Sequence, residues 1–382
     1  MAFLLNQANV LDYLSNIGYH TQQFTGNIES VSAKNFNLLV TLSDRLKLLV
    51  KQERHNQEGQ AAGEFLGEWQ IKGLIQDFPA LQYWQPLLSE IRHFDEQNSI
   101  LVFEYLQDYR DLMDFYVKEN TFPESIASQL GTILATIHRD TYHQQAYQEA
   151  ISLRNPKQGI GIVRRLVRNL EQITPEIFGS VPDDGLKFYA LYQRYDSLGE
   201  ALAELSDAFT ASCLTHNDLK LNNILLHHDW ESSEGGSVRF IDWERSAWGD
   251  PAFDLGTLIG SYLQMWLNSL VVSKSLSIEE SLSLAMTPLD RVQPSIAALT
   301  RAYLAGFPEI LADRSDFIQR AVQFAGLAVI QSILASIEYQ KMLGNSGIAR
   351  LQVAKSLLCR PVQSMPTVFG TLEFTPQVAA VV

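Results

Sequence analysis

Cysteine is nearly missing from this chain of 382 residues, which contains only Cys213 and Cys359. Two cysteines so far apart in the sequence form neither a disulfide framework nor a zinc-binding motif. A reducing cytosol is therefore the simplest compartment, and we expect a cytoplasmic protein.

Positive charge is also scarce, with 29 Lys and Arg against 43 Asp and Glu and a net charge of -14. A general polyanion binder draws most of its affinity from a basic face. The charge balance therefore excludes that class, and we expect no nucleic-acid partner. It fits either a cationic substrate or simple solubility, and we favour solubility because net charge alone says little about a site.

Long apolar runs are missing too. The most apolar stretches are residues 255–272 and 321–337, whereas a membrane-spanning helix needs about 20 nearly unbroken apolar residues. Four polar residues interrupt them: Gln264, Asn268, Gln323 and Gln331. We expect two buried helices and no membrane partner. The N-terminus also lacks the basic region of a signal peptide.

The composition is that of a globular protein, with 46% hydrophobic and 19% charged residues, and the length suits two lobes. The first hundred residues predict a small antiparallel sheet with one inserted helix. The expected helices are 6–18, which Asn6 would cap, and 62–76. The expected strands are 22–25, 36–42, 46–51, 91–94 and 99–105.

After Leu106 the pattern becomes mainly helical, with no internal repeat. The expected helices are 111–118, 123–141, 160–172, 184–209, 254–272, 294–305 and 315–344. Short strand-like pieces interrupt them at 214–216, 224–227 and 238–243. Residues 361–382 contain three prolines and no helical period, and we expect a loose tail. The predicted organisation is an N-terminal lobe over 1–106, a helical lobe over 107–360 and a tail over 361–382.

Two segments carry the candidate catalytic and metal-binding residues. His216, Asp218 and Asn223 follow the spacing H-x-D-x-x-x-x-N, and a second apolar strand ends at Asp242. Phosphoryl transfer from ATP needs a carboxylate that accepts a hydrogen bond from the attacking hydroxyl. It also needs an amide oxygen and a second carboxylate that hold Mg²⁺. A loop from Asp218 to Asn223, followed by a hairpin that returns to Asp242, brings these three groups together.

This arrangement resembles the catalytic loop and the D-F-G segment of the protein-kinase-like fold. It is closer to the aminoglycoside phosphotransferase and choline/ethanolamine kinase branch, where Ile-Asp-Trp-Glu at 241–244 followed by Gly-Asp-Pro-Ala-Phe-Asp at 249–254 is typical. Leu-Leu-Val-Lys at 48–51 resembles the lysine strand, Val-Phe-Glu-Tyr-Leu at 102–106 resembles the hinge, and residues 130–138 resemble the first large helix of the second lobe.

The resemblance covers about residues 20–340. It implies a two-lobe α+β fold, with a small antiparallel-sheet lobe and a larger, mostly helical lobe, and it implies ATP and Mg²⁺ as cofactors.

The resemblance also implies roles for the loop residues. Asp218 would be the catalytic carboxylate, and Asn223 and Asp242 would ligate Mg²⁺. His216 would support the loop through hydrogen bonds rather than act as an acid or base. Lys220 would neutralise the γ-phosphate, and a merely solvated lysine remains an equal alternative.

On the nucleotide side, Lys51 would hold the α- and β-phosphates. Glu68 is the preferred ion-pair partner of Lys51, because Ile71 and Ile75 follow at spacings that bury that helix face, and Glu64, one turn earlier, is the alternative. The backbone of two hinge residues would hydrogen-bond adenine: Glu104 and Leu106.

The expected phosphate loop, residues 24–35, departs from the glycine-rich pattern because Gly26 is its only glycine. A backbone amide or hydroxyl near Ser30 or Ser32 would substitute. Asp254 would cap the next helix and accept hydrogen bonds from amides of the catalytic loop.

These observations predict an ATP- and Mg²⁺-dependent kinase that phosphorylates a hydroxyl of a small molecule. Glu244 and Asp250 either face the acceptor, which would favour an amine-bearing substrate such as an amino alcohol or aminoglycoside, or are merely solvated. One alternative is a kinase of a peptide Ser or Thr in ribosomal-peptide maturation. The other is a non-catalytic module that binds nucleotide or a partner, although such modules usually lack the base, metal or lysine residues that are present here.

Overall fold

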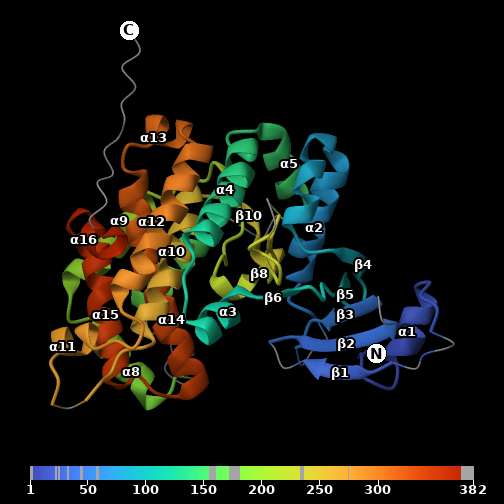
Figure 1. Cartoon of the computed structure of the whole chain (residues 1–382), viewed down its shortest axis with the longest axis horizontal. Helices are drawn as coiled ribbons and strands as arrows, with labels where there is room; N and C mark the ends of the chain where they lie inside the picture. The colour runs from blue at the N-terminus through green and yellow to red at the C-terminus, as the bar shows by residue number, and fades with distance from the viewer. Residues whose placement is uncertain are drawn as a thin grey trace, which may run out of the picture.

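The computed structural model describes residues 3–370 apart from 22–23, 25, 32–33, 44–45, 57–59, 155–160, 172–180, 233–235 and 274. A small lobe built on a β-sheet lies beside a larger helical lobe (Figure 1). This is the two-lobe α+β architecture that the sequence predicts.

The sheet of the small lobe is antiparallel, in the order β1-β2-β3-β5-β4. Its strands are β1 (Ile28–Val31), β2 (Phe36–Ser43), β3 (Leu46–Gln52), β4 (Ile91–Asp95) and β5 (Ile100–Glu104). Directly paired residues share a face, so the register Leu38↔Val50↔Val102 builds one apolar face. Helix α1 (Val10–Asn16) covers this face with Val10 and Leu14. The other face, which carries Lys51, is turned toward the large lobe.

Two expectations for the start of the chain change. Helix α1 begins at Val10 rather than at residue 6, because the Asn6 side chain accepts hydrogen bonds from the amides of Ala8 and Asn9 and so caps a preceding turn. The strand expected at 22–25 falls largely outside the described residues.

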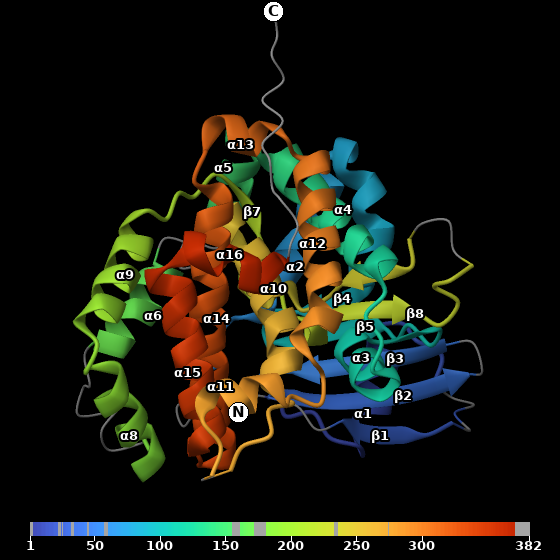
Figure 2. The same cartoon turned by 60° about the vertical axis from the view of Figure 1, so that its left-hand side comes forward.

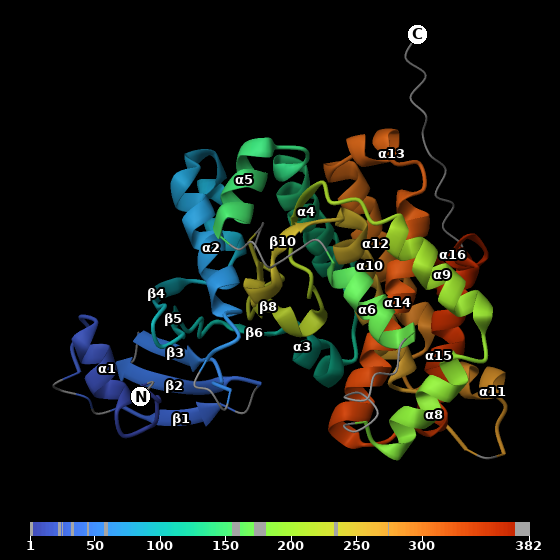
Figure 3. The same ribbon diagram turned by 180° about the vertical axis from the view of Figure 1, so that it is seen from behind.

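Helix α2 (Phe65–Asp77) and the 3₁₀ segment η1 (Pro79–Leu87) connect β3 to β4. Figure 3 shows α2 beside α5. The apolar residues Ile71, Leu74 and Trp84 are buried in the core of the large lobe. The hydrophobic core of the large lobe therefore includes residues from before Leu106 and crosses the predicted boundary.

The large lobe is built around two pairs of packed helices, α4 on α12 and α10 on α14 (Figure 2). Gly256 permits the second contact, since a Cβ there would lie 2.5 Å from the Ala321 carbonyl oxygen. The helices up to α9 are α3 (Leu112–Glu119), α4 (Glu124–Thr141), α5 (Gln145–Arg154), α6 (Ile162–Glu171), α8 (Asp183–Tyr192) and α9 (Asp196–Asp207). Those after it are α10 (Pro251–Leu267), α11 (Ile278–Ser283), α12 (Leu289–Gly306), α13 (Glu309–Asp313), α14 (Phe317–Gln340), α15 (Gly344–Cys359) and α16 (Pro361–Phe369).

The stretch 321–337 lies within the buried helix α14, as predicted. Residues 255–267 of the other stretch lie within the buried helix α10, whereas 268–272 follow that helix, and Val271 and Val272 are exposed. Within the described residues, α14 is the one helix long and apolar enough to span a membrane, and 67% of its most apolar window is buried inside the protein. Burial of this kind is typical of a core helix.

Several helical expectations were wrong. The helix expected over 184–209 is two helices, α8 and α9, and four further helices were not expected: α5, α11, α13 and α15. The expected tail begins instead with α16, which packs against α12 and α14. Pro361 occupies the first turn of α16, where a missing N–H costs nothing.

Short strands and 3₁₀ turns lie between the helices and carry the catalytic-loop motif. One pair is β7 (Cys213–Thr215) with β10 (Ala247–Gly249), and one sheet has the order β6-β8-β9. Its strands are β6 (Tyr109–Asp111), β8 (Ile224–His227) and β9 (Val238–Phe240). The 3₁₀ turns η2 (Leu221–Asn223) and η3 (Trp243–Arg245) precede β8 and follow β9.

Candidate active site

The β8–β9 hairpin brings the two candidate metal ligands to the same end of one small sheet. Ile224 pairs with Phe240, and the Ile241 amide donates to the Asn223 carbonyl oxygen at 2.9 Å. Asn223 immediately precedes this pairing and Asp242 immediately follows it. Asn223 and Asp242, which are 19 residues apart in the sequence, are therefore neighbours in the structure, as predicted.

Asp254 holds the catalytic loop by its backbone. Its fully buried carboxylate accepts hydrogen bonds from the amides of His216 at 2.6 Å and Asn217 at 2.8 Å. Asn217 has φ 62°, a left-handed conformation that asparagine tolerates better than most residues. These bonds are the ones expected of Asp254, but the helix cap is Asp250, whose side chain accepts from the Ala252 amide.

His216 connects this loop to the end of β9. The Nε2 atom donates to the Ile241 carbonyl oxygen at 2.8 Å, which leaves Nδ1 to accept from the Asp218 amide at 3.4 Å. The imidazole is fully buried and lies against the Trp243 ring. Both ring nitrogens are therefore occupied, which fits a supporting role and leaves no nitrogen for proton transfer.

Asp218 presents a half-buried carboxylate at the turn of the loop. Lys220 Nζ lies 3.1 Å from Asp218 Oδ2, and Arg245 Nη1 lies 4.0 Å from Oδ1. Asn223 Nδ2 donates to the Asp218 carbonyl oxygen at 2.8 Å. Lys220 is therefore a neighbour of the candidate base rather than a detached solvated lysine. Arg245 was missed, and no motif in the sequence marks it.

Lys51 contacts Asp242 rather than the expected Glu68. Lys51 Nζ lies 2.5 Å from Asp242 Oδ1. Glu68 accepts a hydrogen bond from Ser89 Oγ at 2.6 Å, and its second oxygen, Oε2, is buried without a hydrogen-bond partner. The alternative Glu64 pairs with Lys34. The expected Lys51–Glu68 ion pair is thus absent from this state, because Asp242 offers Lys51 the nearer carboxylate.

The three charged groups shift one another's ionisation. Burial, and next the negative charge of Asp242, raise the pKa of Glu68 to about 7, although Lys51 and the Ser89 hydrogen bond act to lower it. Burial would raise the pKa of Asp242, but the Lys51 charge and hydrogen bond outweigh it, so the pKa is lowered. Burial would lower the pKa of Lys51, but Asp242 and Glu68 raise it. The cluster therefore holds Lys51 charged and Asp242 ionised.

Asn223 and Asp242 form a donor set that fits Mg²⁺. The Asn223 amide nitrogen is used on the Asp218 carbonyl, so its oxygen is left for another partner. Magnesium usually takes one or two carboxylates and completes its octahedron with water and substrate phosphates. Among the described residues no cluster of three or more His, Cys, Asp or Glu forms a metal cage, so this set is the candidate.

A cavity of about 230 Å³ lies between the sheet face and the hinge. Lys51 and Asp242 line one part of it, and Glu104 and Leu106 line another. The Glu104 amide donates to the Glu90 carbonyl and its carboxylate pairs with Arg92, while the Leu106 carbonyl accepts from the Tyr109 amide. The predicted phosphate and hinge residues thus border one cavity, together with three residues that the sequence analysis missed: Tyr109, Arg110 and Asp111.

The described residues give no support for the predicted phosphate loop. Ser30 pairs with Leu38, so its side chain lies on the α1-covered face, away from Lys51, and its hydroxyl accepts from Gln7. The hydroxyl role expected of Ser30 is therefore wrong. Ser32 lies outside the described residues. Gly26 is needed for packing, because a Cβ there would lie 1.8 Å from the Thr41 carbonyl oxygen.

Asp250 does not face an acceptor and is not solvated, so both expectations for it were wrong. It is fully buried, and it pairs with Arg314 at 2.6 Å and accepts from the Thr210 amide at 2.9 Å. The Glu244 carboxylate lies 3.8 Å from Lys34 Nζ, and burial raises its pKa.

Comparisons with known proteins identify the family of this chain. A sequence model of the phosphotransferase enzyme family matches residues 32–273. A methylthioribose kinase of Klebsiella pneumoniae subsp. pneumoniae is 23% identical, and the match covers 64% of this chain and 66% of that kinase, slightly less than two thirds of its length.

Solved structures match over more of the chain. A choline kinase, LicA, of Streptococcus pneumoniae has a TM-score of 0.50 at 15% identity, covering 92% of this chain and 98% of LicA. A choline/ethanolamine kinase family protein of Mesorhizobium loti has a TM-score of 0.50 at 16% identity, covering 94% and 98%. At such identities these structures establish the fold alone, while the family match covers more than half of the sequence. The chain belongs to the phosphotransferase enzyme family.

Proposed function

We propose that this protein transfers the γ-phosphoryl group of ATP to a hydroxyl of a small molecule, with Mg²⁺ bound by Asn223 and Asp242. One observation carries the proposal. Asp218, Asn223 and Asp242 converge at one end of the β8–β9 hairpin, and Lys51 of the other lobe reaches Asp242 at 2.5 Å. Such a convergence of a base, metal donors and a phosphate-binding lysine is what phosphoryl transfer requires.

Each protein group has a defined task in this reaction. Asp218 accepts the hydrogen bond of the acceptor hydroxyl and orients its oxygen toward the γ-phosphorus. Lys220 and Arg245 add positive charge beside the position where charge develops on the transferred group. A bound Mg²⁺ would neutralise negative charge on the phosphate oxygens. Lys51 exchanges Asp242 for the phosphates as nucleotide enters the cavity.

For the acceptor we propose a neutral, sugar-like alcohol rather than an amine. An ammonium group near the reacting hydroxyl would lie close to Lys220 and Arg245, 3.1 and 4.0 Å from the Asp218 carboxylate, and like charges repel at such separations. Asp250, which was expected to attract an amine, is buried against Arg314. The similarity to methylthioribose kinases also supports a sugar acceptor.

An ATP-consumption assay with Mg²⁺ tests both parts. Pentoses and thiopentoses are compared with amino alcohols and aminoglycosides, and Asp218→Asn is the catalytic control. The matched control, Asp229→Asn, changes an exposed aspartate in the β8–β9 connection. We expect turnover on a sugar that Asp218→Asn abolishes and Asp229→Asn retains. Turnover on amines alone would refute the neutral acceptor, and turnover that survives Asp218→Asn would refute the site.

A further inference from the structure

Lys34 lies in the turn between β1 and β2, within the segment that was expected to bind the phosphates. Its ammonium group pairs with the Glu64 carboxylate just before α2 and lies 3.8 Å from Glu244 Oε1 in η3. Asn37, three residues later, pairs directly with Lys51 in the register of β2 and β3, so the turn adjoins the end of the sheet that carries Lys51. Lys34 therefore connects the small lobe to the turn that follows the candidate metal ligand.

Glu244 also relates Lys34 to the pair formed by Lys51 and Asp242. Burial raises the pKa of Glu244, as do the charges of Glu64 and Asp242, whereas the charges of Lys34 and Lys51 act to lower it. Charges influence one another in this way only at short range, within about 10 Å. The Lys34 side chain is 52% exposed and has a flexible stem, so its ammonium group can turn from Glu244 toward Asp242.

The described part of the β1–β2 segment lacks the donors of a glycine-rich loop. Such a loop binds phosphates through backbone N–H groups that glycine allows to approach closely. Gly26 is the one glycine of residues 24–35, and it packs against the Thr41 carbonyl oxygen. The Ser30 side chain lies on the face covered by α1 and accepts from Gln7. A lysine ammonium, which has three donors and a full charge, can take over the task of these amides.

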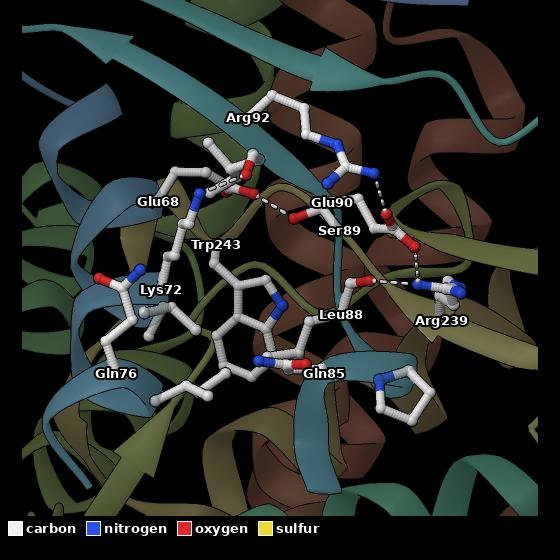
Figure 4. A pocket seen from close by; sticks show the side chains of 14 residues that line it. Glu68, Lys72, Gln76, Gln85, Leu88, Ser89, Glu90, Arg92, Arg239 and Trp243 are labelled. Carbon is white, nitrogen blue, oxygen red and sulfur yellow. Dashed lines mark hydrogen bonds and ion pairs between the residues drawn. The ribbon is translucent and has the colours of Figure 1, made fainter. Parts of the chain in front are cut away.

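Two arginines near the nucleotide cavity are committed elsewhere. Arg92 and Arg239 line a second cavity, of about 430 Å³ behind α2, and Figure 4 shows both guanidinium groups bonded to Glu90. Arg239 also donates to the Leu88 carbonyl at 3.1 Å, and only 13% of its side chain is exposed. Lys34 is less constrained, because its ion pair with Glu64 lies at the surface.

We infer that Lys34 binds the γ-phosphate of the nucleotide and replaces the backbone amides of a glycine-rich loop. In phosphoryl transfer the metal bridges the β- and γ-phosphates. The partner of Lys34 in η3, Glu244, lies just beyond the metal candidate Asp242, so the γ-phosphate is the group within its reach. Lys51 then holds the α- and β-phosphates, and the two lysines divide the triphosphate between them. This inference rests on the proposed function.

Calorimetric titration with Mg²⁺ and without an acceptor tests the inference. The probes are ADP and the β,γ-imido analogue of ATP, which differ by the γ-phosphate. We expect Lys34→Gln to weaken binding of the analogue at least about tenfold, the lower range for a hydrogen bond to a charged group, and to change ADP affinity less than about threefold. Lys187→Gln is the matched control, because Lys187 is also exposed and pairs with Asp184 on α8. It should change neither affinity.

A second variant separates a phosphate ligand from a structural ion pair. Glu64→Gln removes the charge that Lys34 pairs with but keeps the lysine, so it should leave the affinity for the analogue unchanged or raise it. If Glu64→Gln weakens the analogue as much as Lys34→Gln does, Lys34 acts only by holding Glu64, and the inference is overturned.

The two nucleotides also separate the inference from the proposed function. Equal losses for ADP and the analogue in Lys34→Gln, or no loss for either, would overturn the inference and leave the proposed function standing. If the wild type binds neither nucleotide, the proposed function fails and the inference fails with it.

Discussion

Replacement of Glu68 by glutamine tests the electrostatics of the cluster around Lys51. The Glu68 carboxyl is buried, accepts one hydrogen bond from Ser89 and has one oxygen without a partner. Burial first, and the Asp242 charge second, raise the pKa of Glu68 from 4.5 to about 7. Glutamine keeps the shape and can accept the Ser89 hydrogen bond, but it carries no charge at any pH.

The direction in which folding stability changes with pH follows from proton linkage. Between about pH 4.5 and 7 the folded protein holds a proton on Glu68 that the unfolded chain has released. The stability of the wild type therefore falls as pH rises through this window. The full shift corresponds to about 3 kcal/mol, at about 1.4 kcal/mol per pKa unit. Because the glutamine side chain introduced by Glu68→Gln does not titrate, we expect the stability of the variant relative to the wild type to rise by about 2–3 kcal/mol between about pH 5 and pH 8.

Urea unfolding at several pH values, in the presence of a chelator so that Asp242 carries no metal, measures this difference. Glu96→Gln is the control, because Glu96 is exposed in the turn between β4 and β5 and water solvates either form. The reasoning fails if the stability difference for Glu68→Gln is the same at both ends of the pH range. It also fails if the difference changes in the opposite direction.

Three further predictions concern the catalytic loop and its support. Asp218→Asn should lower kcat at least about a hundredfold while the unfolding transition stays unchanged, and near-normal turnover would exclude a base at this position. Asp242→Ala should weaken Mg·ATP binding far more than adenosine binding in calorimetry, and an equal loss for both ligands would make Asp242 a structural residue. Asp254→Ala should destabilise the protein by about 3–5 kcal/mol in urea unfolding, because it leaves two buried loop amides and His138 without their acceptor. A loss below about 1 kcal/mol would show that water replaces the carboxylate.

Four strands of the small lobe and the loop geometry could be predicted because they depend on local pattern, whereas β1, β6 and β10 were not expected. Alternating apolar residues locate β2, β3, β4 and β5 to within a few residues. The short loop keeps Asp218 close to Asn223, and the hairpin that follows returns the chain so that Asp242 lies next to Asn223. In these places one short segment of sequence sets the local structure, and little depends on distant residues.

The choice of ion-pair partner could not be predicted in this way. Helical spacing correctly placed Glu68 on the buried face of α2, but Lys51 selects between this carboxylate and Asp242, which precedes η3. Asp242 has φ 60°, a left-handed conformation that no sequence pattern predicts. Partner choice of this kind depends on tertiary distances, which helical spacing does not contain.

The prolines of residues 361–382 led us to expect a loose tail where this segment instead begins with helix α16. Three prolines within residues 361–382 favour an extended chain, yet at the first turn of a helix proline sacrifices no hydrogen bond and has a favourable φ. Val368 and Phe369 bury the apolar side of α16 against the large core. In this segment, burial of apolar residues outweighs the low helix propensity of proline.

Asp250 and Asp254 illustrate how the acidic residues after the metal candidate are used. Both are fully buried in the first turn of α10 or at its cap, where the positive end of the helix dipole stabilises carboxylates. Asp250 binds Arg314, just before α14, and Asp254 binds the backbone of the catalytic loop. One helix end therefore ties the loop that carries Asp218 to the packed pair α10 and α14. Positioning supplies much of the catalysis in phosphoryl transfer, so the rigidity of this helix end matters to the reaction although neither carboxylate need touch the substrate.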